Sequence, residues 1–191
     1  TDAHGRDHVS KAEMAFDKDN KILGLRVKTH ANFGAYMSLF SSAVPTYLYA
    51  TLLSGQYVIP AIYAEVIGVY TNTTPVDAYR GAGRPEANYY MERLIDAAAD
   101  EMGISRVTLR KRNFIKPSQL PFPAASGVTY DSGDFAGVFQ KALEISDYEN
   151  FAKRKKESRK NGKLRGIAVG SYLEVTAPPS GELGRFAEPG P

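Results

Sequence analysis

The first third of the chain alternates apolar and polar positions in the way that is typical of β-strands. HVSKAEMAF (residues 8–16) shows this alternation, and ILGLRVKTHANFGAY (residues 22–36) resumes it after a short polar interval. The interval, DKDNK, gathers Asp and Asn between two apolar runs, which indicates a hairpin turn. AIYAEVIGVYTN (residues 61–72) is rich in β-branched and aromatic residues and predicts a third strand.

The strongest helical pattern begins at Pro85 and ends at Met102. Its apolar residues recur at intervals of three and four: Ala87, Tyr90, Met91, Leu94, Ile95, Ala98 and Met102. Pro85 suits the first position of a helix, and Gly103 suits the position just after its end. A shorter helix is predicted in PTYLYATLLSG (residues 45–55), where Gly55 would end it.

The second half alternates between helical patterns and chain breakers. Ser105 suits the N-cap of a short basic helix, SRVTLRKRNF, and the three prolines of IKPSQLPFPAASG then indicate a linker. SGDFAGVFQKALEISD predicts an amphipathic helix capped by Ser132 or Asp134. A basic helical segment (residues 148–160) and a strand in LRGIAVGSYLEVTA (residues 164–177) complete the pattern. Hairpins before helices, without strict β–α–β alternation, predict a mixed α+β fold.

Composition narrows the chemistry. The chain has 191 residues, of which 43% are hydrophobic and 24% charged, so we expect a buried core. It contains no cysteine, which excludes disulfides, thiolate zinc sites, iron–sulfur ligation and thiol catalysis within this chain. No run of about 18 apolar residues and no signal-peptide pattern is present, and we expect a cytoplasmic protein without a membrane span.

Two clusters invite a functional interpretation that we do not favour. The run KRKKESRKNGK (residues 153–163) holds much of the net charge of +3, and we interpret it as a solvated helix face, not a nucleic-acid-binding surface. The spacing of His4 and His8 suits a metal on a helix, but their segment is predicted to enter a strand. No third ligand is evident beside them or beside His30, so we interpret all three as surface or hydrogen-bonding histidines.

The segment DAYRGAGRPEA (residues 77–87) has the features of an anion-binding loop in front of the strongest helix. Helix N-termini carry unpaired N–H groups and about half a positive charge. Gly81, Ala82 and Gly83 would let a ligand approach the backbone, and Arg80 adds a permanent cation. The segment matches neither the Walker loop nor the dinucleotide-binding fingerprint. On these residues alone, ligand binding and ordinary turn chemistry both stay open.

Six segments together resemble a known family. They are DAHGRDHVSKAEMAFDKDNKILGLRVKTHANFGAY, PTYLYATLLSGQYVIPAIYAEVIGVYTNT, TNTTPVDAYRGAGRPEANYYMERLIDAAADEMG, LRKRNFI, YDSGDF and KLRGIAVGSYLE. In this order they resemble the molybdenum-binding large subunit of the xanthine dehydrogenase, aldehyde oxidase and carbon monoxide dehydrogenase family. The carbon-monoxide-dehydrogenase-type large chains are the most similar branch. Because those subunits are much longer, we expect this chain to be an internal fragment.

The resemblance implies a fold of the molybdopterin-binding-domain type, spanning parts of two subdomains. Residues 1–115 would be the C-terminal part of the first domain, residues 116–130 a linker, and residues 131–191 the start of the second. It also implies a site at the loop before the strongest helix. Its cofactor-binding residues would be Arg80, Gly81, Ala82 and Gly83, and its substrate-pocket residues Tyr79 and Ala82.

The implied activity is that of a molybdenum hydroxylase, which oxidises an aldehyde or N-heterocycle with water-derived oxygen. The cofactor would be molybdopterin, with the cytosine dinucleotide form as one option. FAD and 2Fe–2S clusters would lie in a medium and a small partner subunit, assembled as a dimer of heterotrimers. The family's general-base glutamate is expected beyond Pro191, so neither Glu174 nor Glu182 takes that role. We therefore expect no catalytic residue or metal ligand here, and no activity from this chain alone.

Departures from the family pattern narrow the substrate. Gly81 stands where carbon monoxide dehydrogenases place a copper-bridging cysteine, and Ala82 stands where xanthine-oxidising enzymes place a phenylalanine. We therefore expect neither carbon monoxide nor purines as substrates. Tyr47 or Tyr49 would contact the substrate in the space that Ala82 leaves. GSYLEVTAPPSGE (residues 170–182) either reaches the cofactor from the second half or forms a core strand with its exit loop.

The alternative function is non-catalytic. In it, the chain is an α/β module that binds an anion or assembles with a partner through its tyrosine-rich surface.

Overall fold

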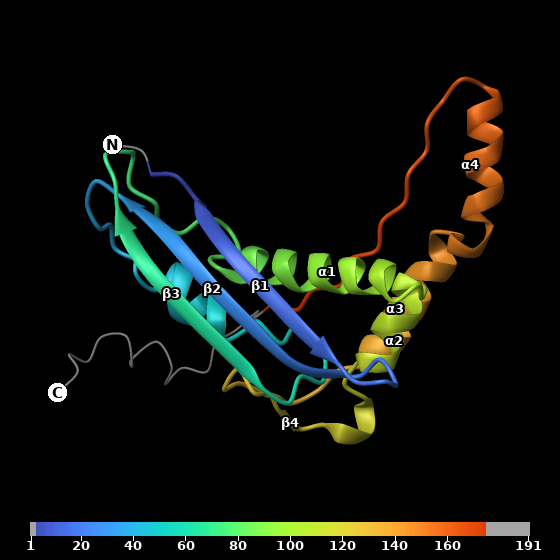
Figure 1. The fold of residues 1–191 in the computed structure, drawn as a ribbon, viewed down its shortest axis with the longest axis horizontal. Helices are drawn as coiled ribbons and strands as arrows, with labels where there is room; N and C mark the ends of the chain where they lie inside the picture. The colour runs from blue at the N-terminus through green and yellow to red at the C-terminus, as the bar shows by residue number, and fades with distance from the viewer. Residues whose placement is uncertain (1–2, 175–191) are drawn as a thin grey trace.

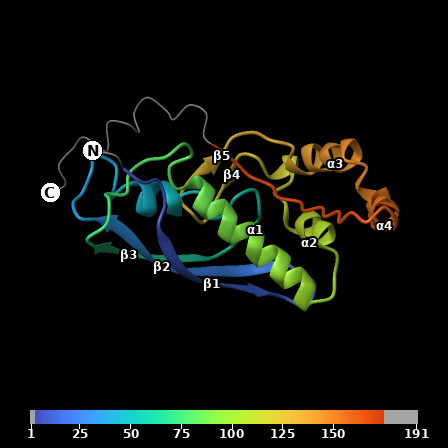
Figure 2. The same cartoon turned by 90° about the horizontal axis from the view of Figure 1, so that it is seen from above.

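The computed structural model describes residues 3–174, and its elements form the predicted mixed α+β fold (Figure 1). A three-stranded sheet contains β1 (His8–Phe16), β2 (Ile22–Gly34) and β3 (Ile62–Tyr70) in that order. The long helix α1 (Arg84–Glu101) crosses one face of the sheet. Figure 2 shows the other helices on the same side, so the opposite face of the sheet is open.

The predicted hairpin joins β1 to β2, which pair antiparallel from His8↔Ala31 to Phe16↔Ile22. Its turn follows from Asp17, whose carboxylate accepts hydrogen bonds from the backbone N–H groups of Asp19 and Lys21 at 2.9 and 2.8 Å. This side-chain mimicry of a backbone turn is what Asp offers between two strands. The Asp17 side chain therefore stabilises the turn that joins the first two strands of the sheet.

β3 pairs parallel with β2, so the chain must cross over between them. The crossover contains η1 (Val44–Leu48), a π-helical turn that begins one residue before the predicted short helix. Turns continue from there to Gly55, whose φ of +50° favours glycine. The crossover covers the sheet on the same side as α1, and its residues Val44 and Tyr49 lie against Gly83 at the N-terminus of α1.

Ion pairs join neighbouring strands on the open face of the sheet. Arg26 on β2 pairs with Glu13 on β1, and Lys28 pairs with Glu65 on β3 at 2.9 Å. The opposite face of β2 is apolar, with Val27 fully buried. The period-2 alternation thus separates a solvated face from a core face.

The core lies between the sheet and α1. Four apolar residues of α1, spaced four apart, are buried: Ala87, Met91, Ile95 and Ala99. They pack in one cluster with side chains from β2, the crossover and the following helix, such as Leu25, Leu53 and Leu109. Burying a large apolar side chain contributes about 1.5–3 kcal/mol. The predicted end of the helix is also confirmed, because Gly103 has a φ of +65° just beyond it.

The N-caps of the two helices after α1 are side chains that bond to N–H groups three residues further along the chain. In α2 (Arg106–Asn113), the Ser105 hydroxyl accepts a hydrogen bond from the Thr108 N–H. In α3 (Phe135–Ile145), Asp134 and not Ser132 is the cap, since its carboxylate accepts from the Gly137 N–H at 2.9 Å. Of the two caps predicted for α3, the structure therefore selects the carboxylate.

The proline-rich interval packs against the first half of the chain. It contains η2 (Pro117–Gln119), β4 (Phe122–Pro123) and β5 (Thr129–Tyr130). Ala124 and Tyr130 form a buried cluster with Leu52 from the crossover and Ile115. The division of the chain at residues 116–130 stays a prediction.

The basic segment forms η3 (Tyr148–Asn150) and α4 (Phe151–Lys160). None of the α4 residues is buried, which fits the interpretation of a solvated helix face. Among residues 3–174, no helix has both the length and the apolar character that a bilayer crossing requires.

The strand predicted over residues 164–177 is wrong for residues 164–174, which run without sheet pairing. A strand needs a neighbouring ladder, and the described sheets pair only β1 with β2, β2 with β3, and β4 with β5. Residues 175–177 lie outside the described part.

Candidate functional site

The loop before α1 has an unusual backbone. Three successive residues have positive φ: Gly81 at 100°, Ala82 at 43° and Gly83 at 90°. The loop folds back on itself, with the Ala82 N–H donating to the Tyr79 carbonyl at 2.7 Å and the Arg84 N–H to the Gly81 carbonyl at 3.1 Å. A left-handed alanine costs roughly 1–2 kcal/mol, and such strain concentrates where function holds the backbone.

Packing explains the two glycines of this loop. A Cβ on Gly81 would lie 2.5 Å from the Pro85 ring. A Cβ on Gly83 would lie 2.3 Å from the Val44 carbonyl oxygen and 2.8 Å from the Tyr49 nitrogen. The loop is therefore clamped between α1 and the crossover, which gives it the rigidity that a binding site needs.

Arg80 and Gly81 line a cleft of about 270 Å³ at the N-terminus of α1. The other lining residues are Arg84, Pro85 and Asn88 from α1 and Tyr172, Leu173 and Glu174 from the far end of the described chain. The Tyr79 side chain is 62% exposed, Ala82 is partly exposed and Gly83 is buried. The structure thus brings two of the five predicted site residues into one cleft, while Tyr79, Ala82 and Gly83 lie beside it in the same loop.

Arg6 supports the loop from below and was not predicted from the sequence. Its Nη2 donates to the Arg80 carbonyl at 2.7 Å, and its guanidinium carbon lies 5.0 Å from the centroid of the Tyr79 ring. Its Nε lies 3.4 Å from the carboxylate of Glu86 in the first turn of α1. The available signal was Glu86, because an acidic residue this close to the core needs a cation.

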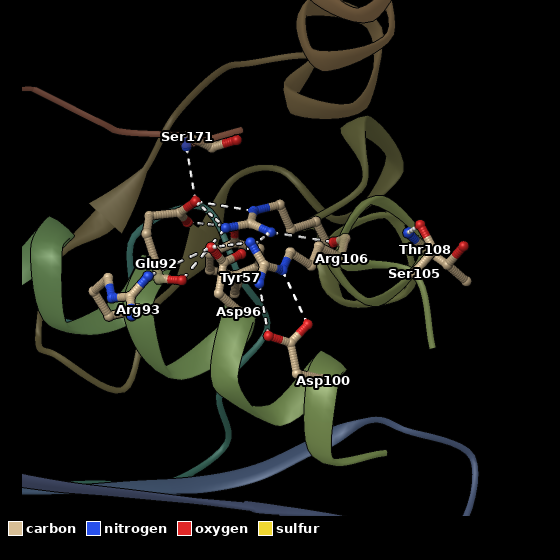
Figure 3. Close-up of polar contacts among 10 residues, drawn as sticks. Tyr57, Glu92, Arg93, Asp96, Asp100, Ser105, Arg106, Thr108 and Ser171 are labelled. Atoms are coloured by element: carbon tan, nitrogen blue, oxygen red, sulfur yellow. Dashed lines mark hydrogen bonds and ion pairs between the residues drawn. The ribbon is translucent and has the colours of Figure 1, made fainter. Parts of the chain in front are cut away.

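The second half of the chain reaches the same cleft. The Ser171 N–H donates to Glu92 Oε2 at 2.9 Å, and Arg84 pairs with Glu174 at 3.4 Å (Figure 3 shows the Ser171 contact). Of the two alternatives for residues 170–182, the described residues 170–174 are not a strand but lie across α1 beside the loop. Glu182 lies outside the described residues.

A buried ion network anchors this crossing segment. Arg110 on α2 is fully buried and donates to Glu92 at 2.8 Å and to Asp96 at 2.9 Å, both on α1. The Tyr57 hydroxyl donates to the other Glu92 oxygen at 2.6 Å. Burial and the Glu92 charge raise the pKa of Tyr57 well above its ordinary value, so this hydroxyl stays protonated. Glu92 thus joins α1, α2, the crossover and Ser171.

Arg106 extends the network to Asp100, as Figure 3 shows. It donates to Asp100 at 2.6 Å and to Asp96 at 3.3 Å, and its side chain is 42% exposed. The network therefore runs from the buried Arg110 to the partly solvent-exposed Arg106.

No metal site is evident among residues 3–174, where no three His, Asp or Glu side chains are grouped to hold an ion. His8 departs from the interpretation of a surface or hydrogen-bonding histidine. Its Nδ1 is buried without a hydrogen-bond partner in this part of the chain, and burial lowers its pKa.

Of the two tyrosines given as alternatives for contact with the substrate, Tyr49 does not suit that role. Tyr49 is fully buried, its hydroxyl lies 3.4 Å from the Thr29 hydroxyl, and burial raises its pKa to about 12. Tyr47 is 45% exposed, and its contact with a substrate stays a prediction.

Comparison with known proteins agrees with this geometry. Residues 1–114 match the family model described as the molybdopterin cofactor-binding domain. The gamma subunit of the 6-hydroxypseudooxynicotine dehydrogenase complex of Paenarthrobacter nicotinovorans is 34% identical over 90% of this chain and 22% of its own length. The carbon monoxide dehydrogenase large chain of Hydrogenophaga pseudoflava is 37% identical over 92% of this chain and 22% of its own.

Solved structures give the same result. Quinoline 2-oxidoreductase from Pseudomonas putida 86 superposes with a TM-score of 0.77 and 32% identity, over 84% of this chain and 20% of that chain. A Cu,Mo-CO dehydrogenase gives 0.72 and 33%, over 84% and 21%. The chain spans about a fifth of the length of these relatives. The chain therefore belongs to the molybdopterin cofactor-binding domain family.

Proposed function

We propose that residues 79–83 form one wall of a molybdopterin-binding site in the large subunit of a molybdenum hydroxylase. The observation that carries the proposal is the cleft at the N-terminus of α1, where Arg80 and Gly81 meet Arg84. A cation, a glycine backbone and a helix N-terminus at one place form an environment suited to an anion.

The residues present fit the cofactor. Molybdopterin carries a phosphate and an electron-rich metal–sulfur group, and the exposed Arg80 offers guanidinium donors that bind such oxygens in a fork. Arg84 adds a second guanidinium at the cleft, which pairs with Glu174 at 3.4 Å. Gly81 and Ala82, both with positive φ, leave the loop without bulky side chains. When bound, the cofactor would supply the redox chemistry that transfers water-derived oxygen to a carbon atom. The role of this chain is to hold and orient it.

For the substrate we propose an aldehyde or an N-heterocycle. Relatives named as a nicotine 6-hydroxylase large subunit and a quinoline 2-oxidoreductase favour the N-heterocycle. Ala82 carries only a methyl group and lies in the same loop as the exposed Tyr79 side chain. Without a cysteine after Arg80, copper-dependent oxidation of carbon monoxide is not part of the proposal.

The partners follow from the same reasoning. Relatives named as gamma and large subunits belong to multi-subunit enzymes. We propose an FAD-binding medium subunit and a 2Fe–2S small subunit, because a chain without cysteine cannot ligate the clusters itself. A cytosine dinucleotide form of the pterin, a dimer of heterotrimers and a cytoplasmic location complete the proposal.

The test is Arg80→Ala in the full-length enzyme complex. We expect loss of bound pterin and molybdenum, or a fall in kcat of about 10²-fold or more, because one preorganised donor to a charged group is worth this much. Far-ultraviolet circular dichroism should stay unchanged, since Arg80 is exposed. Arg26→Ala, on the open face of the sheet, is the matched control.

Two results would count against the proposal. Unchanged pterin content and activity in Arg80→Ala would remove Arg80 from the site. A complex purified from a molybdenum-replete host without molybdenum or pterin would favour the non-catalytic anion-binding or assembly module.

A further inference from the structure

We propose that Arg6 is a positioning residue for the proposed site, setting the backbone at Arg80 and Gly81 through one guanidinium shared with Glu86 and Tyr79. The inference rests on the proposed function and assigns a role to a residue 74 positions away from the loop in sequence.

The first support is that the Arg6 guanidinium has three separate partners. It donates to the Arg80 carbonyl at 2.7 Å, lies over the Tyr79 ring at 5.0 Å and faces Glu86 at 3.4 Å. Gly5 allows this approach, since a Cβ there would lie 2.6 Å from the Tyr79 Cβ. The segment before β1 is therefore pressed against the loop.

The second support is the state of Glu86. It is 7% exposed, and neither carboxylate oxygen has a hydrogen-bond donor within residues 3–174. The 3.4 Å pairing with Arg6 is thus an ion pair without hydrogen-bond geometry, and it is the ion pair that the described residues give Glu86. A buried carboxylate needs a counter-charge, so Glu86 holds Arg6 in place as much as Arg6 neutralises Glu86.

The consequence for the site follows from the planar peptide bond. The carbonyl of Arg80 and the N–H of Gly81 belong to one rigid trans unit. A hydrogen bond that fixes this carbonyl also fixes the direction of the Gly81 N–H, and Gly81 lines the cleft. Arg6 therefore orients a backbone donor at the cleft without reaching the cleft itself.

The experiment uses the full-length enzyme complex and four variants: Arg6→Met, Glu86→Gln, the double variant Arg6→Met/Glu86→Gln, and the control Arg26→Met. Arg6→Met alone leaves a buried charge unpaired and is expected to lower the unfolding midpoint. Glu86→Gln in the double variant removes that charge and is expected to restore the midpoint. The double variant therefore isolates the positioning role from the stability role.

Two readouts report on the loop. Hydrogen–deuterium exchange of peptides covering residues 79–83 is expected to be at least about tenfold faster in the double variant, and unchanged in Arg26→Met. Pterin content, measured by fluorescence after acid release, is expected to fall in the double variant. Wild-type exchange and wild-type pterin content in the double variant would overturn the inference, since Arg6 would then only neutralise Glu86.

If the double variant does not assemble, Arg6→Lys decides. Its ammonium can balance Glu86 but lacks the separate Nε and Nη2 groups by which Arg6 faces Glu86 and the Arg80 carbonyl at once, so faster exchange of residues 79–83 is expected. Exchange at the wild-type rate overturns the inference. Arg80→Ala separates this failure from that of the proposed function. If Arg80→Ala retains pterin and activity, the proposed site itself is contradicted. If Arg80→Ala loses them while the double variant behaves like the wild type, only the role of Arg6 is contradicted.

Discussion

At the scale of the residue, the two glycines that flank α1 are required for different physical reasons. Gly83 and Gly103 both have positive φ, at 90° and 65°. A Cβ on Gly103 would meet nothing within 4 Å, whereas one on Gly83 would meet the backbone of the crossover. Gly103 is needed only for its conformation, while Gly83 is needed for its conformation and for close packing.

This contrast predicts the effect of alanine at each position. Gly103→Ala should lower the free energy of unfolding by about 1 kcal/mol, the usual cost of a left-handed alanine. Gly83→Ala should cost several times more, about 3 kcal/mol or above, because backbone atoms at 2.3 and 2.8 Å cannot rotate away as a side chain can. Urea denaturation of the two variants checks the difference, and equal losses would show that the crossover does not clamp the loop.

At the scale of the element, α1 and α2 are held together by charge inside an apolar core. The Arg110 side chain pairs with two carboxylates and has no solvent-accessible surface. Such a pair contributes little net stability when intact, but removing one partner leaves buried charges uncompensated. The same two helices also carry an exposed version of the interaction at Arg106.

The two arginines therefore make a matched pair of substitutions. Arg110→Met should lower the free energy of unfolding by about 3–5 kcal/mol, because Glu92 and Asp96 lose a buried partner. Arg106→Met should cost about 1 kcal/mol or less, as is usual for an exposed ion pair. The measurement is the urea midpoint and slope of each variant. Comparable losses would contradict the assignment of Arg110 as the buried anchor.

At the scale of the whole molecule, three distant segments meet at the N-terminus of α1. They are residues 5–6, residues 79–84 and residues 171–174, joined by Arg6 to the Arg80 carbonyl, Ser171 to Glu92, and Arg84 to Glu174. The cleft lies where residues 80–84 and residues 172–174 meet α1, and Arg6 contacts the loop from outside the cleft. In the full-length subunit, we expect this convergence to hold the second half of the chain against the proposed cofactor loop.

Glu174→Gln tests that convergence. The Arg84–Glu174 pair is part-exposed and worth roughly 0.2–1 kcal/mol, so its loss should speed amide exchange of residues 171–174 by up to about fivefold. Glu157→Gln, which removes an exposed ion pair on α4, should leave these amides unchanged. Hydrogen–deuterium exchange of the full-length subunit gives both values. If Glu174→Gln leaves the segment as protected as before, the ion pair does not hold the second half of the chain.

Several predictions from the sequence are confirmed because their signals are local. Asp17 forms the hairpin turn, Ser105 caps α2 and Gly103 follows α1, each within a few residues of the bonds it makes. The family resemblance, which located the loop at residues 79–83, is confirmed by the match of residues 1–114. The roles of the individual loop residues stay predictions.

Other predictions failed or were narrowed where the answer depended on packing. The β-like run over residues 164–174 has no strand to pair with, and Tyr49 faces Thr29 in the core instead of a substrate. Periodicity shows that a residue has a buried side, but it does not show which neighbour covers that side.

The amino-acid sequence by itself determined the three strands of the main sheet, the hairpin turn at Asp17, helix α1 with its end at Gly103 and the Ser105 cap, because turn chemistry, helical period and glycine conformation act between near neighbours. Only the tertiary structure decided that Arg6 reaches the Arg80 carbonyl and that Ser171 reaches Glu92, across 74 and 79 residues. The physical reason is that such contacts form when whole elements pack, and the free energy of that packing is spread over the core instead of being encoded beside either partner.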